Sequence, residues 1–367
     1  MLFSPAVSEA EVRAVQDGVA NDVRGDGRTL TQRRSFSIRR GHGAGVSLVD
    51  VEYDGSCVEV QCGGTTVVAA AAPSVVEVGA EAGRARGPLF VSIDAVPAVV
   101  DYHAQALRNR GARYRHAFLS FVATTIRQTF GAEEVTVREQ LGVAEAERVD
   151  EDEDEDEDAA ATEGPLGGGA AGGRQHGKLL GEDGAGFPGE DLYIGGGYAF
   201  RTDVDVHVLQ TNGGNLPSVI SLAVHAALKA MRLPCVTLHE ASGGVSLEVD
   251  RSKPFRRPVD WSRLPVLAVL LISPTRHYVV DPTPMEELAL PQQLHLAVNA
   301  AGQVCYLRYQ QLPSRRGNAW RLGAGDAVEP LLPTGMNVPD LTAVLREVPY
   351  ICQAIISECD EALHKSE

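Results

Sequence analysis

A turn of two glycines between an alternating strand and an apolar helix constrains this chain most. Residues 203–209 alternate between polar and apolar side chains, which predicts a strand. Gly213 and Gly214 follow it, Asn215 is a candidate N-cap, and residues 216–231 are almost continuously apolar. A strand, a glycine turn and a helix N-terminus in this order commonly present backbone N–H groups to an anion. The sequence therefore predicts the scaffold of an anion site.

The same turn lacks the side chains that a phosphate-using enzyme needs. Such an enzyme is expected to place a cation and a hydroxyl group beside the phosphate. Residues 213–217 contain neither arginine nor threonine, and Pro217 removes one N–H donor. The sequence therefore predicts the backbone scaffold of a phosphate site that lacks the side chains needed to bind phosphate and use it in a reaction.

The helix over residues 216–231 is expected to be buried on most of its sides, because few polar residues interrupt it. His225 within it is interpreted as a semi-buried histidine whose hydrogen bonds are satisfied, in preference to a ligand, and no metal ligand is assigned. The six cysteines show no C-x-x-C spacing. We expect them to be reduced, structural thiols, as in a nuclear or cytosolic protein.

Residues 142–190 are predicted to form a disordered insertion. The net charge of the chain is −16, but residues 150–158 are nine consecutive acids, without which it would be −7. Glycines follow the acids, and large apolar residues are rare, so the segment cannot bury enough surface to order itself. It is either a solvated spacer or an acidic tract for a basic partner. Gly172 to Lys178 matches most of a P-loop, but Leu179 stands where serine or threonine is required.

Strands and helices are expected on both sides of this insertion, after an N-terminal helical extension over residues 1–22. Helices are expected at 114–126, closed by Gly131, at 216–231 and at 338–363, where Pro349 should kink or split the last one. The expected strands are 35–40, 44–53, 57–61, 66–72, 89–96, 203–209, 235–240, 265–272, 276–281 and 293–309.

No apolar run approaches the ~18 residues that span a bilayer. The first ten residues lack the basic start and apolar centre of a secretory signal. A membrane partner is therefore not expected.

Several short motifs occur in an order that resembles a known family. They are Val23 to Arg28, Gly64 to Ala70, Gly213 to Asn215, and His277 to Thr283, which leads to Glu286 and Glu287. In this order they resemble the RNase PH-like subunits of the eukaryotic RNA exosome, and among these the non-catalytic ring subunits. The resemblance covers residues 7–140 and 191–365 and leaves out the insertion.

The resemblance implies an α+β, RNase PH-like fold of two βαβα-type halves, residues 23–141 and 191–367, with a C-terminal helix. It also implies a six-membered ring with other RNase PH-like subunits, RNA-binding cap subunits, RNA in a central channel and no cofactor. Such a subunit would support 3′–5′ RNA processing and degradation, including rRNA maturation, in the nucleus, the nucleolus and the cytoplasm.

Catalytic members of this family attack RNA with inorganic phosphate held at a turn rich in glycine, threonine and arginine. The matching turn here, Gly213, Gly214 and Asn215, has lost the arginine, so it is interpreted as a vestigial phosphate turn in a chain that is not an enzyme. Asp281 and Glu287 stand near the place of the acidic group that assists proton transfer. The alternatives are an active phosphate-dependent 3′–5′ exoribonuclease and a small-molecule kinase, the latter suggested by the glycine-rich stretches alone.

An arginine-rich segment resembles the family's loop that faces RNA. Arg108, Arg110, Arg113 and Arg115 precede and enter the first predicted helix, and we assign them as RNA-binding residues. The alternative is a solvated loop with a role at a dimer interface. A second group is formed by Arg33, Arg34, Arg39 and Arg40. Their spacing along a strand places them on both faces, so we expect some to pair with acids of a neighbouring subunit.

Overall fold

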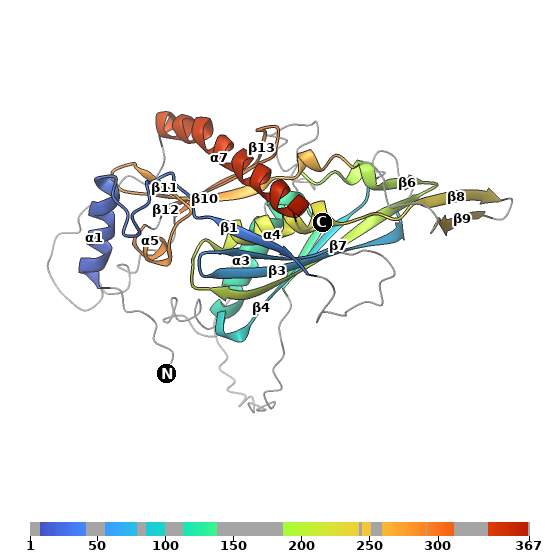
Figure 1. Cartoon of the computed structure of the whole chain (residues 1–367), viewed down its shortest axis with the longest axis horizontal. Helices are drawn as coiled ribbons and strands as arrows, with labels where there is room; N and C mark the ends of the chain where they lie inside the picture. The colour runs from blue at the N-terminus through green and yellow to red at the C-terminus, as the bar shows by residue number, and fades with distance from the viewer. Residues whose placement is uncertain are drawn as a thin grey trace, which may run out of the picture.

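The computed structural model describes residues 8–41, 56–78, 86–99, 113–137, 186–241, 244–250, 259–290, 292–311 and 337–365. Two sheets dominate these segments, with helices between and around them (Figure 1). The predicted strand at 44–53 and the acidic run lie outside the described residues.

The larger sheet has the strand order β1-β2-β3-β7-β4-β5, and the short β6 pairs with β7. Strands β3 and β7 are antiparallel, with Thr65 opposite Thr211 and Glu77 opposite Tyr198, whereas β4 runs parallel to both β7 and β5. The bounds are β1 Phe36–Arg40, β2 Ser56–Cys62, β3 Thr65–Glu77, β4 Leu89–Ala95, β5 Glu134–Val137, β6 Tyr193–Gly195 and β7 Tyr198–Thr211.

A second, antiparallel sheet has the order β11-β10-β12-β13, and a separate hairpin of β8 and β9 projects from the body (Figure 1). The bounds are β8 Val236–Ala241, β9 Gly244–Val249, β10 Val266–Ile272, β11 Tyr278–Val280, β12 Gln292–Val298 and β13 Val304–Gln311. The single strand expected at 293–309 is therefore wrong. Gly302, at a φ of +79°, lies in the turn that divides it into β12 and β13.

The described residues include the α-helices α1 Glu9–Ala20, α3 Arg113–Phe130, α4 Leu216–Ala230, α5 Pro284–Ala289 and α7 Val338–Lys365. Residues 97–99 are also helical, and two short 3₁₀ helices cover Gly189–Leu192 and Trp261–Arg263. Helix α4 packs against β2, β3 and β7 of the large sheet and against β10 of the second sheet, so it lies between the two sheets. Helix α7 packs against β1, β10 and β12, and α1 lies beside α5.

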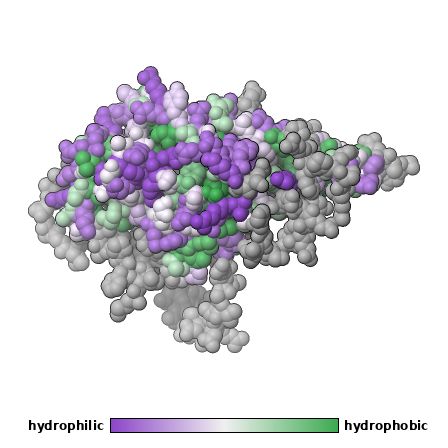
Figure 2. Space-filling view, in the orientation of Figure 1, coloured by the Kyte–Doolittle hydropathy of each residue, from purple (hydrophilic) through white to green (hydrophobic). Residues whose placement is uncertain are grey.

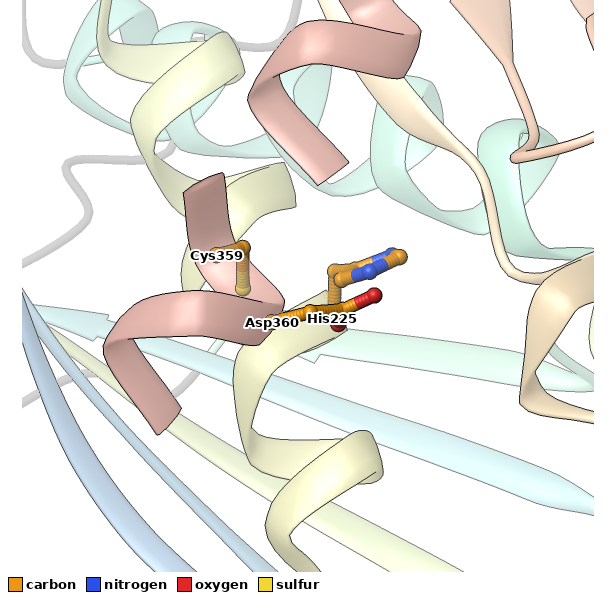
Figure 3. A group of neighbouring side chains, drawn as sticks. All are labelled: His225, Cys359 and Asp360. Carbon is orange, nitrogen blue, oxygen red and sulfur yellow. The ribbon is translucent and has the colours of Figure 1, made fainter. Parts of the chain in front are cut away.

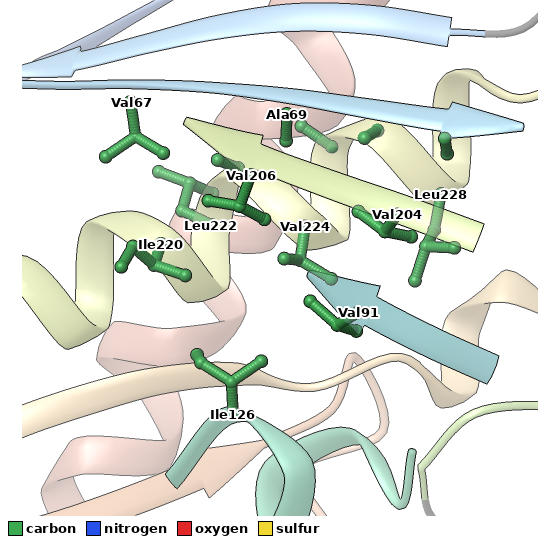
Figure 4. Packing of buried hydrophobic residues seen from close by; sticks show 14 of the residues in the cluster. Val67, Ala69, Val91, Ile126, Val204, Val206, Ile220, Leu222, Val224 and Leu228 are labelled. Carbon is green, nitrogen blue, oxygen red and sulfur yellow. The ribbon is translucent and has the colours of Figure 1, made fainter. Parts of the chain in front are cut away.

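The main core forms where α3 and α4 cover one face of the large sheet (Figure 4). Alternate residues of β3 and β7, such as Val67 and Val206, point to this face because side chains alternate along a strand. They meet Leu222 of α4, while Ile126 reaches the same cluster from α3. Truncating a buried residue of this size to alanine typically costs about 2–5 kcal/mol. The predicted burial of the 216–231 helix is confirmed.

Strand β7 links the two parts of the chain that the sequence separates at the insertion. It follows residue 190, yet it lies in the middle of the large sheet, between β3 and β4. The boundary of the insertion is also corrected, because residues 186–190 are described and packed. The N–H of Phe187 donates to Phe130 O at 3.1 Å, and the N–H of Gly87 donates to Gly189 O at 2.7 Å. Phe187 also packs against the main core, and this contact stabilises the ordered conformation of residues 186–190.

Helix α7 continues through Pro349 without interruption, so the predicted split is wrong. Val344, Val348 and Cys352 lie on its buried side, against the second sheet. This packing on both sides of Pro349 holds the helix together where one backbone hydrogen bond is lost.

All six cysteines are free thiols, and Cys62, Cys352 and Cys359 are buried. Cys57 and Cys305 are only partly buried. None of the helices in the described segments is long and apolar enough to cross a membrane. Hydrophilic residues dominate the face shown in Figure 2, with small hydrophobic areas between them.

Candidate functional site

The glycine turn joins the end of β7 to the start of α4, and its glycines are required by close backbone packing. A Cβ atom on Gly213 would lie 2.7 Å from the N atom of Gly64 and 2.8 Å from that of Thr65. Gly214 has a φ of +71°, which favours glycine. The turn that connects β2 to β3 thus lies in direct contact with the predicted anion turn.

Asn215 occupies the N-cap position of α4, but its side chain does not cap the helix. It adopts a left-handed conformation, with a φ of 53°. Its Nδ2 donates to Asp281 Oδ1 at 2.8 Å, and its backbone N–H donates to Glu287 Oε1 at 2.7 Å. The predicted N-cap position is therefore confirmed, but the side chain makes no capping hydrogen bond, because the left-handed backbone of Asn215 departs from the extended conformation that a side-chain cap uses. The helix start is oriented by two acids of the same chain.

A cation and a hydroxyl group do stand at this turn, although they come from distant positions in the sequence. Arg34 donates from Nη1 to the carbonyl oxygen of Gly213, and Thr65 donates from Oγ1 to Gly214 O at 2.9 Å. Both groups bind carbonyl oxygens of the turn. They therefore hold its backbone in place, and these donors are not directed at a free anion.

Asp281 is the acceptor at the centre of the site. Its Oδ2 accepts from the backbone N–H of Arg34 at 2.8 Å, from Arg34 Nε at 2.9 Å and from Arg28 Nη1 at 3.0 Å. Its Oδ1 accepts from Arg34 Nη2 at 2.7 Å in addition to Asn215. Burial alone would raise the pKa of Asp281, but the hydrogen bonds and charge of Arg34 hold this pKa below its ordinary value. Both carboxylate oxygens of Asp281 thus accept several hydrogen bonds from this chain.

The loop that carries Asp281 is fixed by the segment before β1. Arg24 is fully buried and donates to both carboxylate oxygens of Glu286, at 2.8 and 2.7 Å. It also donates to the carbonyl oxygens of Val280 and Asp281, each at 3.0 Å. Glu286 in turn closes a capping box with Thr283 at the start of α5. The Arg-Gly-Asp-Gly-Arg stretch therefore anchors the acidic side of the site.

Glu287 differs from Asp281 in its protonation. Burial raises its pKa to about 7, and the Asn215 N–H and the charge of Arg34 offset only part of this effect. Asp281 and Glu287 thus both accept a hydrogen bond from Asn215 at the turn. Their pKa values are shifted in opposite directions.

The second arginine group is used within the chain. Arg33 forms an ion pair with Glu358 of α7, Arg34 pairs with Asp281, and Arg39 lies 3.8 Å from Glu59. These three residues thus have acidic partners within the same chain, and pairing with a neighbouring subunit stays a prediction.

Little open space remains beside the turn. A cavity of about 50 Å³ is lined by Arg34, Cys62, Asn215 and Asp281 together with apolar residues of α4 and β10. A wider groove of about 950 Å³ lies between residues 28–35 and α7, with Tyr350 on its wall. The arginines of that groove, Arg28 and Arg33 among them, are already paired with acids.

The predicted RNA-binding arginines are placed only in part. Arg113 and Arg115 lie in the first turn of α3, whereas Arg108 and Arg110 lie outside the described residues. Their role in RNA binding stays a prediction.

Sequence reasoning missed Arg24, Arg28, Arg34 and Thr65 as members of the site. Thr65 directly follows the Gly63–Gly64 turn, and Arg24 and Arg28 lie in a motif quoted for the resemblance. These were the available signals. No local pattern predicted that Arg34 would reach the glycine turn.

Comparison with known proteins is informative once this geometry is clear. No protein-family model matches the chain. An archaeal exosome core structure aligns with 96% of this chain and 97% of its own, at a TM-score of 0.52 and 15% identity. The exosome of Archaeoglobus fulgidus, solved with RNA bound to its active site, aligns with 95% of this chain and 98% of its own, at a TM-score of 0.51 and 16% identity. The described chain therefore has an RNase PH-like fold, as predicted.

A sequence relative points to the same class. The exosome complex component Rrp42 of Pyrobaculum aerophilum is 39% identical over 99 residues, which are 27% of this chain and 34% of that protein. The alignment thus spans about a third of that relative's length. The fold and this match make the chain similar to the RNase PH-like subunits of the exosome core, which supports the resemblance drawn from the sequence at that level.

Proposed function

We propose that this chain is a non-catalytic ring subunit of an RNA exosome. It would support ring assembly and the threading of RNA for 3′–5′ processing and degradation, including rRNA maturation. Its partners would be other RNase PH-like subunits in a six-membered ring, RNA-binding cap subunits and RNA. The supporting observation is that the glycine turn is occupied by carboxylates of the chain itself, Asp281 and Glu287.

The electrostatics of the turn support the absence of phosphate chemistry. The Asn215 N–H, which a phosphate could use, is held by Glu287 at 2.7 Å. Arg34, the nearest cation, forks onto Asp281 and binds the Gly213 carbonyl. An entering phosphate would have to displace a buried, charge-paired carboxylate, and a buried charge left without its partner typically costs about 3–5 kcal/mol. Pro217 leaves one N–H fewer at the helix start.

The alternative, an active phosphate-dependent 3′–5′ exoribonuclease, rests on a specific observation. Arg34 and Thr65 bring to the turn the two functional groups that residues 213–217 lack. Glu287, with a pKa of about 7, would be suited to proton transfer near neutral pH. This alternative requires Arg34 to exchange Asp281 for phosphate.

A phosphorolysis assay separates the two functions. The purified chain is incubated with single-stranded RNA and inorganic phosphate, and release of nucleoside diphosphates is measured. We expect none above a no-enzyme control. Phosphate-dependent release that is lost in Asp281→Asn would establish the exoribonuclease and exclude the non-catalytic role. Native mass spectrometry of the assembly purified from its source tests the partners directly.

The proposed location follows from the proposed complex, which would act in the nucleus, including the nucleolus, and in the cytoplasm. Imaging of the tagged chain in its own cells tests this. Signal confined to a membrane compartment would contradict the proposal.

A further inference from the structure

A cluster of potential metal ligands lies between α4 and α7, apart from the glycine turn. It consists of His225 on α4 and of Cys359 and Asp360 on α7 (Figure 3). One ring nitrogen, the Sγ atom and one carboxylate oxygen all lie within 4.8 Å of one another. His225 and Cys359 are both 0% exposed. Helices α4 and α7, far apart in the sequence, thus bring three different donor types together.

The hydrogen bonding of His225 leaves one nitrogen available. Nδ1 lies 3.2 Å from the carbonyl oxygen of Pro265, which can only accept, so Nδ1 carries the hydrogen. Nε2 then holds the lone pair, and it has no hydrogen-bond partner among the described residues. His225 is thus more deeply buried than the expected semi-buried histidine, and only one of its two ring nitrogens has a hydrogen-bond partner among the described residues. A histidine that ligates a metal through one nitrogen usually donates from the other to a carbonyl or carboxylate group.

We propose that His225, Cys359 and Asp360 form a binding site for a divalent cation of the zinc type. Zinc accepts nitrogen, sulfur and oxygen ligands at about 2.0–2.3 Å, which places ligand atoms about 3.3–3.8 Å apart in a tetrahedron. The three atoms of the cluster need to approach one another by only about 1 Å. Side chains on two packed helices can make this adjustment by small rotations about their χ angles.

Two of the three ligands would be anionic once such an ion is bound. Binding would release the proton of the Cys359 thiol to solvent, and the resulting thiolate and the Asp360 carboxylate would together neutralise the 2+ charge. Lys229 is the competing cation, since its Nζ lies 2.5 Å from Asp360 Oδ1. A carboxylate has two oxygens, so Asp360 can accept from Lys229 through Oδ1 and ligate through Oδ2. The Asp360 side chain is 40% exposed, which leaves a path for the ion and a water molecule as fourth ligand.

Cobalt(II) is the probe that tests this site, because it takes the place of zinc and absorbs visible light. The full-length chain is stripped with EDTA, dialysed and titrated with Co²⁺. We expect one equivalent per chain to give tetrahedral d–d bands and a thiolate-to-cobalt charge-transfer band, both lost on adding Zn²⁺. Cys359→Ser should remove the charge-transfer band and weaken binding at least about tenfold.

Cys352→Ser is the matched control, because Cys352 is an equally buried thiol on the same helix. It should keep the charge-transfer band. The wild-type spectrum provides a test that does not depend on how any variant folds, and far-UV circular dichroism checks the variants. Asp360→Asn, at the more exposed position, gives a second variant that should weaken binding. Absence of the charge-transfer band in the wild type, or its persistence in a folded Cys359→Ser protein, would overturn the proposal and leave the Lys229–Asp360 ion pair as the function of these residues.

Discussion

The guanidinium group of Arg34 donates two parallel hydrogen bonds to the carboxylate of Asp281, from Nη2 to Oδ1 at 2.7 Å and from Nε to Oδ2 at 2.9 Å. This fork is the preferred geometry of an arginine–carboxylate pair. It ties the segment before β1 to the loop after β11, and its remaining Nη1 reaches the Gly213 carbonyl. One pair thus joins three segments that are far apart in the sequence.

Replacing Arg34 should therefore destabilise the fold strongly. Arg34→Gln leaves the buried Asp281 carboxylate with fewer donors, and we expect a loss of about 3 kcal/mol in the free energy of unfolding. Urea denaturation of the purified chain measures it. Arg39→Gln is the control, because the Arg39 side chain is 72% exposed and should change stability by less than about 0.5 kcal/mol. Equal effects of the two substitutions would show that the fork contributes little.

Glu287 should make stability depend on pH near neutrality. Its pKa is about 7 in the folded chain and 4.5 ordinarily, so the folded state binds the proton more tightly than the unfolded state. The resulting stabilisation is complete below about pH 4.5 and is lost as the pH rises through 7. Glu287→Gln should therefore nearly match the wild type at pH 4.5 and be more stable by up to about 3 kcal/mol at pH 8.

Chemical denaturation at pH 4.5, 6 and 8 tests this difference, with the exposed Glu361→Gln as control. A constant difference between Glu287→Gln and the wild type across these pH values would contradict the prediction.

Most of the insertion should be dispensable, but its last residues should not. Replacing residues 143–185 by a short Gly/Ser linker should change the melting temperature little, since loop closure costs only about 0.6 kcal/mol per doubling of length. Extending the replacement to residue 189 removes the packing of Phe187 and the Gly87–Gly189 hydrogen bond, and should lower the melting temperature by several degrees. The melting temperatures of the two variants are compared by thermal unfolding. Identical values would show that residues 186–189 are also dispensable and that the insertion ends after residue 189.

The arginine segment should contribute to RNA capture by the assembled ring. Triple replacement of Arg108, Arg110 and Arg113 by alanine removes up to three phosphate contacts, so it should weaken RNA binding of the complex and reduce its salt dependence without changing base preference. Fluorescence anisotropy at several salt concentrations measures this. An unchanged salt slope in a normally assembled ring would refute the assignment.

The sequence predicted local features well and the site only in outline. The alternation over 203–209 and the apolar run over 216–231 predicted β7 and α4, because periodicity and burial are local properties. The Arg34–Asp281 pair joins residues 247 positions apart, and no local pattern encodes such a contact. Asn215 was placed correctly at the N-cap by its usual preference, but no local pattern predicted that its side-chain amide would donate to Asp281, 66 positions away.

The place of β7 in the large sheet has a consequence for biosynthesis. Strands β3 and β4 leave the ribosome long before β7, which must insert between them. Until residue 211 is made, both strands keep an unpaired edge facing the gap, and each edge can pair wrongly with another chain. The nascent chain therefore needs protection over this interval, and a break in translation before residue 198 would release a fragment prone to aggregation.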